Sequence, residues 1–248
     1  MTEPVRLAKV LAAMLNCSRR EAEQYIEGGW VTVDGVTVEE PQFRVLDQAV
    51  VLDPAASLLA ITPVTLLLHK PAGVAAQADG QHDHERALRE LLVPASQWAN
   101  DRSGIRVLKK HFTATELVTP LATAASGLVV CTQDWRVARK LKEDAHLLEH
   151  EVLVEVTGTA KPGGLERVNR ADHGFTFEGR PLPPVKASWQ SENRLRFALK
   201  GELPGQLAYL CESMGLTVTA MKRIRIGRVP MGQLPPGQWR YLLPEERF

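Results

Sequence analysis

Apolar residues near the start of the chain recur at helical spacing. In VRLAKVLAAMLN, residues 5–16, this spacing predicts an amphipathic helix. Ser18 with Glu21 three residues later is the signature of a capping box, so a second helix is predicted over about residues 19–27. Two consecutive glycines follow that segment and end it.

The next apolar pattern has a period of two. In WVTVDGVTV it alternates around Asp34-Gly35, a dipeptide typical of a tight hairpin turn. A further strand is expected over residues 49–53. Prolines bracket the uncharged stretch that comes next, so we predict a first domain over residues 1–54 and a linker over 55–63.

The rest of the chain, residues 64–248, mixes short apolar runs with amphipathic segments. It shows neither a strict strand–helix alternation nor a repeat, which predicts an α+β domain with a largely antiparallel sheet. Strands are predicted at 65–70, 126–132, 151–156, 195–200 and 217–227, and helices at 84–92, 135–144 and 205–214.

Composition places the protein among packed globular proteins. Of its 248 residues 44% are apolar, yet no apolar run reaches 18 residues, so no membrane segment is expected. The N-terminus lacks the pattern of a signal peptide. Three distant cysteines without a CxxC motif argue against a disulfide framework or a zinc site and favour a reducing compartment. We therefore expect a cytoplasmic protein.

Charge is unevenly distributed along the chain. The net charge is +1, whereas residues 1–54 alone carry five basic and nine acidic side chains. Basic residues gather in 101–113 and 219–240. These two segments are compatible with a surface that binds a polyanion, but charge alone favours solvated side chains that pair locally.

The first domain resembles the S4 RNA-binding domain. The matching residues are Arg6, Leu7, Lys9, the SRREA run at 18–22, Ile26, Gly29, Val31, Val33 and Gly35. In that family the two short helices form the surface that faces RNA. The resemblance therefore implies that Arg6, Lys9, Arg19 and Arg20 contact RNA.

The order of motifs along the whole chain resembles the S4-containing pseudouridine synthases of ribosomal RNA, small-subunit type. The motifs are KPAG at 70–73, SGLVVCTQD at 126–134, EVLVEVTG at 151–158, KRIRIG at 222–227 and LPPGQW at 234–239. The resemblance implies an S4 domain joined to a pseudouridine synthase fold with a mixed, largely antiparallel sheet. It implies a monomer that acts on structured, ribosomal RNA without a cofactor or a metal.

Three positions depart from the pattern of that family. Its essential aspartate precedes the Ser-Gly-Leu motif, and Ser126-Gly127 places it at Ala122. The tyrosine that stacks on the target uracil corresponds to Val152. The arginine that pairs with the aspartate corresponds to Ala208. An acid, its ionic partner and an aromatic platform are therefore all absent.

Other residues could supply parts of such a site. Asp101 and Glu116 are the candidate replacements for the missing acid. Lys70 ends an apolar strand, and alternation in KRIRIG predicts that Arg223 and Arg225 share one strand face, where both could bind phosphate. Trp98, Trp135 and Trp239 lie among apolar residues, and we expect them in or near the core.

These observations support three hypotheses. The first is an RNA-binding relative of the pseudouridine synthases that has lost catalysis. The second is an active synthase with a relocated acid. The third is a protein-interaction module on an S4 scaffold, which the acidic balance of residues 1–54 allows.

Overall fold

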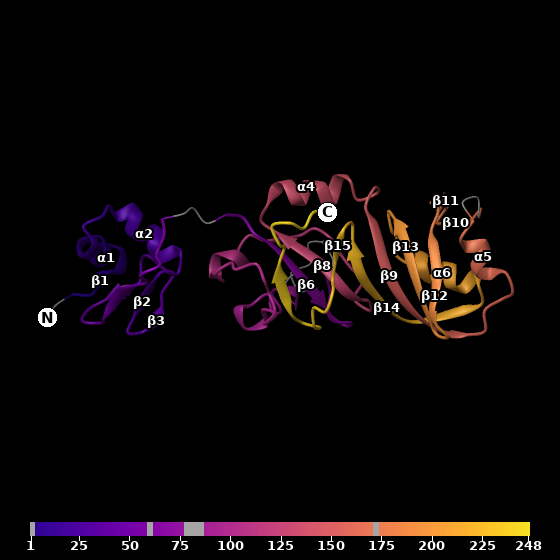
Figure 1. Ribbon diagram of the computed structural model, residues 1–248, viewed down its shortest axis with the longest axis horizontal. Helices are drawn as coiled ribbons and strands as arrows, with labels where there is room; N and C mark the ends of the chain where they lie inside the picture. The colour runs from indigo at the N-terminus through magenta and orange to yellow at the C-terminus, as the bar shows by residue number, and fades with distance from the viewer. Residues whose placement is uncertain (1–2, 59–61, 77–86, 171–173) are drawn as a thin grey trace. The chain divides into compact units, whose positions relative to one another are not determined.

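The computed structural model of the protein describes residues 3–58, 62–76, 87–170 and 174–248, which form two compact units (Figure 1). The first unit comprises Met1–Pro63 together with Arg106–Thr113. The second comprises Val64–Ile105 and Ala114–Phe248. The chain thus passes between the units three times, whereas the sequence suggested a single linker.

The helices of the first unit lie where the sequence predicted, but the first begins two residues later and ends one residue earlier than expected. They are α1 (Leu7–Leu15) and α2 (Arg19–Glu27). The capping box is present, because the Ser18 hydroxyl accepts a hydrogen bond from the Glu21 backbone and the Glu21 carboxylate accepts one from the Ser18 backbone, at 3.2 and 2.7 Å. Both bonds satisfy backbone groups that a free helix end would leave open.

A hairpin follows these helices. Asp34 and Gly35 both have positive φ, 49° and 80°, as a tight two-residue turn requires. They join β2 (Val31–Val33) to β3 (Val36–Thr37), and β5 (Val50–Leu52) pairs with the other edge of β2. A separate pair joins β1 (Val5–Arg6) to β4 (Arg44–Val45). The core of the unit includes Leu7, Leu11, Ala22, Ile26 and Val31, all fully buried.

The segment Arg106–Thr113 packs within the first unit, although the sequence analysis assigned it to the second domain. The Arg106 guanidinium lies 3.9 Å from the ring centroid of Trp30. It donates hydrogen bonds to the Gly29 carbonyl at 2.8 Å and to Asp53 at 2.7 Å. This one side chain therefore contacts both the end of the second helix and the end of the last strand.

The lysines of the same segment pair with acids of residues 1–54 in the first unit. Within η2 (Lys109–Phe112), Lys109 bonds to Glu40 at 2.8 Å and its backbone N–H to Glu39 at 2.7 Å. Lys110 lies 3.2 Å from Glu27. Three added basic residues bring the net charge of −4 for this unit to −1. Local pairing, one of the two alternatives for segment 101–113, accounts for these charges.

The second unit is built on one nine-stranded sheet in the order β12-β13-β9-β14-β8-β6-β16, with β15 paired to β14 and β7 to β8 (Figure 1). The strands are β6 (Thr65–Lys70), β7 (Glu116–Leu117), β8 (Ser126–Thr132), β9 (Glu149–Gly158), β12 (Lys186–Ser191), β13 (Arg194–Lys200), β14 (Leu216–Ile226), β15 (Val229–Pro230) and β16 (Trp239–Tyr241). The β14–β8 pairing is parallel, and the other ladders among the described strands are antiparallel. The predicted mixed, largely antiparallel α+β fold is confirmed.

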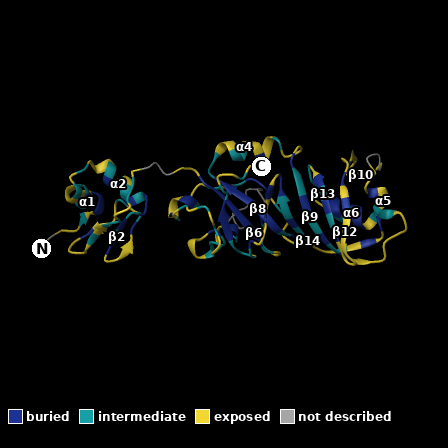
Figure 2. Ribbon diagram, viewed as in Figure 1, coloured by how far each residue is buried: buried dark blue, intermediate teal, exposed yellow. Residues whose placement is uncertain are grey.

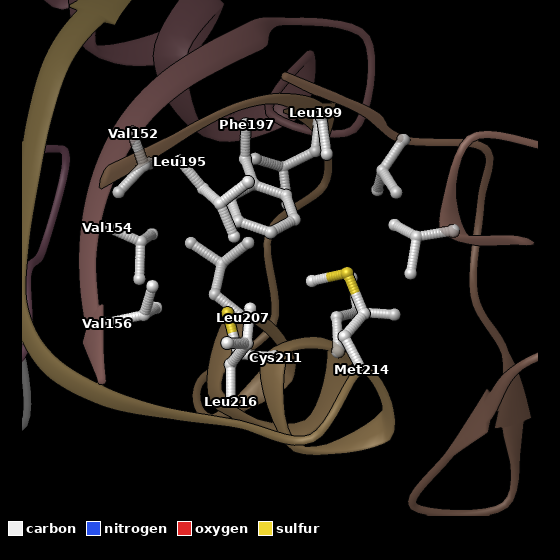
Figure 3. Packing of buried hydrophobic residues seen from close by; sticks show 14 of the residues in the cluster. Val152, Val154, Val156, Leu195, Phe197, Leu199, Leu207, Cys211, Met214 and Leu216 are labelled. Atoms are coloured by element: carbon white, nitrogen blue, oxygen red, sulfur yellow. The ribbon is translucent and has the colours of Figure 1, made fainter. Parts of the chain in front are cut away.

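Helix α6 (Gln206–Ser213) covers one end of this sheet. It packs Leu207, Leu210 and Cys211 against the apolar side chains of β9 and β13 (Figure 3). The other end of the sheet contains β6 and β8, whose residues are buried along almost their whole length (Figure 2). Helix α4 (Trp135–Glu143) contributes Leu141 to the core there.

The remaining elements are short. They are α5 (Gly164–Val168), η1 (Pro94–Ser96), β10 (Thr176–Phe177) and β11 (Arg180–Pro181). The helix predicted at 84–92 lies partly outside the described residues, and residues 87–89 are helical. None of the described helices is long and apolar enough to cross a membrane.

Candidate functional site

A cavity of about 580 Å³ opens in the second unit between the loop before β8, strand β9 and helix α6. Ala122 lines it from the loop, Val152 from β9 and Ala208 from α6. The three residues that depart from the family pattern thus surround one space. Its walls are otherwise mostly apolar, with a few polar groups, as in typical small-molecule sites.

Arg223 fixes the loop that carries Ala122. Its side chain is 3% exposed and donates hydrogen bonds to the carbonyls of Thr119, Pro120 and Leu128, at 2.7, 3.1 and 2.8 Å. Burial lowers the pKa of Arg223 to about 10, so the group stays charged at neutral pH. Carbonyl oxygens, and no carboxylate, are its hydrogen-bond partners here.

Lys70 holds the other end of the same loop. Its buried ammonium donates to the carbonyls of Thr123, Pro71 and Val74, at 3.2, 3.0 and 2.7 Å. Burial lowers the pKa of Lys70 to about 8, and the charge of Arg223 acts in the same direction. Lys70 is fully buried and therefore does not offer the exposed phosphate contact that was expected of it.

A β-bulge separates Arg225 from Arg223. On β9, Arg223 pairs with Val152 and Arg225 pairs with Glu151, where a regular ladder would place His150. Because paired residues share a face and neighbours along a strand do not, the bulge sends the two arginines to opposite faces. The expectation that they share one face is wrong.

Arg225 also has acidic partners on its own face of the sheet. It contacts Glu149 and Glu151 at 2.5 and 2.7 Å, and Arg196 contacts Glu151 as well. Burial opposes ionisation of Glu151, but hydrogen bonds from the two arginines outweigh it and hold the pKa of Glu151 below its usual value. Arg225 is therefore engaged in a structural ion-pair network.

Two polar residues that the sequence analysis did not select also line the cavity, namely His150 on β9 and Glu202 after β13. Their side chains are 16% and 22% exposed, and His150 Nδ1 lies 3.6 Å from a Glu202 carboxylate oxygen. The Glu202 charge also acts on Arg223 and favours its charged form. A signal existed, since Glu202 is the one acid in GELPG, a turn between a strand and a helix.

The two acids proposed as replacements lie elsewhere. Asp101 accepts hydrogen bonds from the backbone of Ser103 and Tyr241 and from Gln97, and thereby stabilises a loop against β16. Glu116 on β7 pairs with Lys142 of α4. Neither lines the cavity formed by the described residues, whose only carboxylate is that of Glu202.

The basic residues of the S4 region are exposed. Arg6, Lys9, Arg19 and Arg20 all lie on the surface of the first unit. Arg19 pairs with Glu23 at 3.1 Å, and the other three make no ion pair within the described part of the chain. Three cations without an acidic partner are available for a polyanion.

The tryptophans differ from expectation at one position. Trp239 is fully buried and donates to the Val93 carbonyl, and Trp98 packs at the edge of a core. Trp135, expected in or near the core, is instead 66% exposed at the start of α4, because that helix turns Leu141 and Val137 inward. Arg139 lies 5.5 Å above its ring.

A family model described as the S4 domain matches residues 5–51. A protein of Mycobacterium tuberculosis named "Uncharacterized RNA pseudouridine synthase" is 31% identical over 98% of this chain and 91% of its own length. The chain belongs to the RNA pseudouridine synthase family. A ribosomal small subunit pseudouridine synthase A of Vibrio cholerae is 25% identical over 98% of this chain and 97% of its own.

Solved structures support the fold of this family member. A crystal structure of a pseudouridylate synthase matches with a TM-score of 0.57 and 17% identity, covering 96% of both chains. The likeness therefore extends across both units. At 17% identity this likeness supports the fold and says nothing about the chemistry of the site.

Proposed function

We propose that this member of the pseudouridine synthase family binds structured RNA, ribosomal RNA in particular, and does not isomerise uridine. The observation that carries the proposal is that Ala122, Val152 and Ala208 line one cavity. In the family the corresponding residues supply the acid at the sugar, the platform for the base and the partner of the acid. An alanine or valine side chain has no atom that can attack, accept a proton or stack.

The loop around Ala122 can keep its fold without an aspartate, because the buried cations beside it, Arg223 and Lys70, have other hydrogen-bond partners. Losing an acid from a buried ion pair leaves an unpaired charge, which costs several kcal/mol. Here Arg223 and Lys70 together donate to six carbonyl oxygens. The fold of the loop therefore does not depend on a carboxylate at position 122.

Retained cations on the S4 region support RNA binding. Arg6, Lys9 and Arg20 have no acidic partner among the described residues, and segment 106–113 neutralises acids that would otherwise repel phosphate. Binding of this kind releases counterions and weakens steeply with salt. A protein-interaction module would not need this cationic surface.

The deciding experiment for catalysis uses unmodified ribosomal RNA. The protein is incubated with the transcript, and pseudouridines are mapped by carbodiimide treatment and primer extension. We expect no new modification. A new pseudouridine would favour the alternative of an active synthase with a relocated acid, and its loss in Glu202→Gln would identify that acid.

A second experiment restores the missing pair. The double variant Ala122→Asp with Ala208→Arg should gain at most partial isomerase activity, because Val152 still offers no ring on which the base can stack. Either single variant should remain inactive. Full activity from Ala122→Asp alone would contradict the importance that we assign to the other two positions.

RNA binding is tested on the S4 surface. We expect Arg19→Ala with Arg20→Ala to weaken binding of structured ribosomal RNA about tenfold and to flatten its dependence on salt. The matched control is Arg44→Ala in the same unit, where the guanidinium bonds to the Pro4 carbonyl at 3.1 Å. Equal affinity of the double variant and the control, or no salt dependence, would refute an RNA-binding S4 surface.

A further inference from the structure

The cavity of the second unit is large enough for a nucleobase, and its wall is mostly apolar. Its volume of about 580 Å³ lies within the range of small-molecule sites, roughly 300–1,000 Å³. Four alanines and Val152 lie in its wall where larger side chains would reduce the space. The alanines are at positions 122, 125, 145 and 208.

The cavity has few polar groups, and only some of them have hydrogen-bond partners within the protein. Thr119 is occupied, because its hydroxyl accepts from the Val130 backbone and its carbonyl accepts from Arg223. By contrast, His150 Nδ1 is enclosed and has no hydrogen-bond partner. The Glu202 carboxylate lies 3.6 Å from that nitrogen and accepts no hydrogen bond from the described residues. The Glu202 carboxylate at the cavity wall is thus available to a ligand, whereas the enclosed His150 nitrogen is not.

The chemistry of these groups restricts the ligand. An ionised carboxylate only accepts hydrogen bonds, and it binds best to two adjacent donors that it can meet with both oxygens. Apolar walls on either side suit a flat ring. Uracil presents one N–H between two carbonyl oxygens, which the carboxylate would repel. Guanine presents N1–H and the 2-amino group side by side, and is the only neutral base of unmodified RNA that does so.

We propose that the cavity binds a guanine base, with its N1–H and 2-amino edge on the carboxylate of Glu202. The inference rests on the proposed function, since the base would come from bound RNA by leaving its stack. The cavity would then anchor the RNA at an unpaired guanosine. Loss of the aspartate, arginine and tyrosine would have enlarged the site for a purine.

The test measures the affinity of the protein for the 5′-monophosphates of guanosine, inosine and uridine, by calorimetry or NMR titration. Inosine lacks only the 2-amino group. We expect the guanosine nucleotide to bind at least tenfold more tightly than the inosine nucleotide, and the uridine nucleotide to bind most weakly. Equal binding of all three, no binding by any, or preference for uridine would overturn the inference.

Two variants locate the binding to the cavity. Glu202→Gln should abolish the preference for guanosine over inosine, while the exposed Glu212→Gln on α6 should keep it. Ala208→Leu should fill the cavity and abolish nucleotide binding while RNA affinity through the S4 surface remains measurable. A preference that survives in Glu202→Gln would refute the assignment.

The two proposals can fail separately. Nucleotide titrations do not depend on the S4 surface, so RNA binding without a guanosine preference overturns only the cavity ligand. Absence of structured RNA binding, or formation of pseudouridine, overturns the proposed function whatever the nucleotides do.

Discussion

Substitution of Arg223 should destabilise the second unit far more than substitution of an exposed arginine. Arg223→Met keeps the apolar stem of the side chain and removes every donor. Three carbonyls, those of Thr119, Pro120 and Leu128, then lose a charged partner inside the protein. The perturbation acts on the loop that carries Ala122 and on its junction with β14.

The magnitude follows from these bonds. A buried acceptor left unsatisfied costs about 1–3 kcal/mol, and bonds to a charged donor lie toward the upper half of that range. Some of the loss is recovered, since water can reach the cavity side of the loop and the thioether packs better than a charged group in an apolar site. We therefore expect the free energy of unfolding to fall by about 3–5 kcal/mol.

Urea unfolding followed by tryptophan fluorescence measures this loss, because four of the five tryptophans lie in the second unit. With an m-value of about 2–3 kcal/mol/M, the midpoint should fall by about 1–2 M. The matched control is Arg194→Met, which removes an exposed ion pair to Glu155 and should cost less than about 1 kcal/mol. If the two variants lose equal stability, the three hydrogen bonds of Arg223 do not hold the loop.

Two further predictions concern the same unit. Lys70 and the two buried cysteines should affect stability with opposite signs as the pH rises. Lys70, with a folded pKa of about 8 against an ordinary 10.5, binds fewer protons when folded and should contribute a rise of about 1 kcal/mol from pH 7.5 to 9. Cys131 and Cys211, with pKa values raised by burial from 9.0 to about 12, bind more protons when folded and should oppose this rise from about pH 8.5 upward. The stability lost in Lys70→Met should therefore be about 1 kcal/mol greater at pH 9 than at pH 7.5, and a difference in urea midpoint that stays constant across this range would contradict the assignment. Gly127→Ala should cost about 3 kcal/mol or more, because φ is +119° and the new Cβ would lie 2.5 Å from the backbone nitrogen of the facing residue in β14. Gly73→Ala, with φ +87° and open space around it, should cost about 1 kcal/mol in the same urea assay, and a similar loss in both would exclude the close approach to β14 as the cause.

Local chemistry explains why the first unit could be predicted well. The capping box at Ser18 and the turn at Asp34-Gly35 depend on side chains and backbone angles within four residues, so their signals are complete in the sequence. The alignment of the chain to the motifs of the family was equally informative about which residues line the site. The three positions assigned from Ser126-Gly127 and two other motifs converge on one cavity.

Long-range contacts explain what could not be predicted. Segment 106–113 joins the first unit through partners more than 50 residues away, and nothing local indicates them. The bulge at 223–225 is set by pairing with β9, so simple alternation placed Arg225 on the wrong face. Glu202 enters the cavity only because the turn between β13 and α6 brings it beside His150, and its place in the GELPG turn marks a turn without indicating this contact.

The distribution of charge around the cavity argues that the change in this protein went beyond removal of an acid. Arg223 and Lys70 are buried beside the loop and are bonded to carbonyl oxygens, so they make the backbone around Ala122 rigid without requiring an anion there. The only carboxylate that lines the cavity among the described residues belongs to Glu202, in the turn after β13, and its neighbour is a histidine. A site that had simply decayed would be expected to fill with apolar side chains, since an empty space in a core costs stability. An open cavity lined by a carboxylate that accepts no hydrogen bond from the described residues is instead the arrangement of a binding site, which is why mononucleotide binding and pseudouridine formation should be measured together on the same preparation.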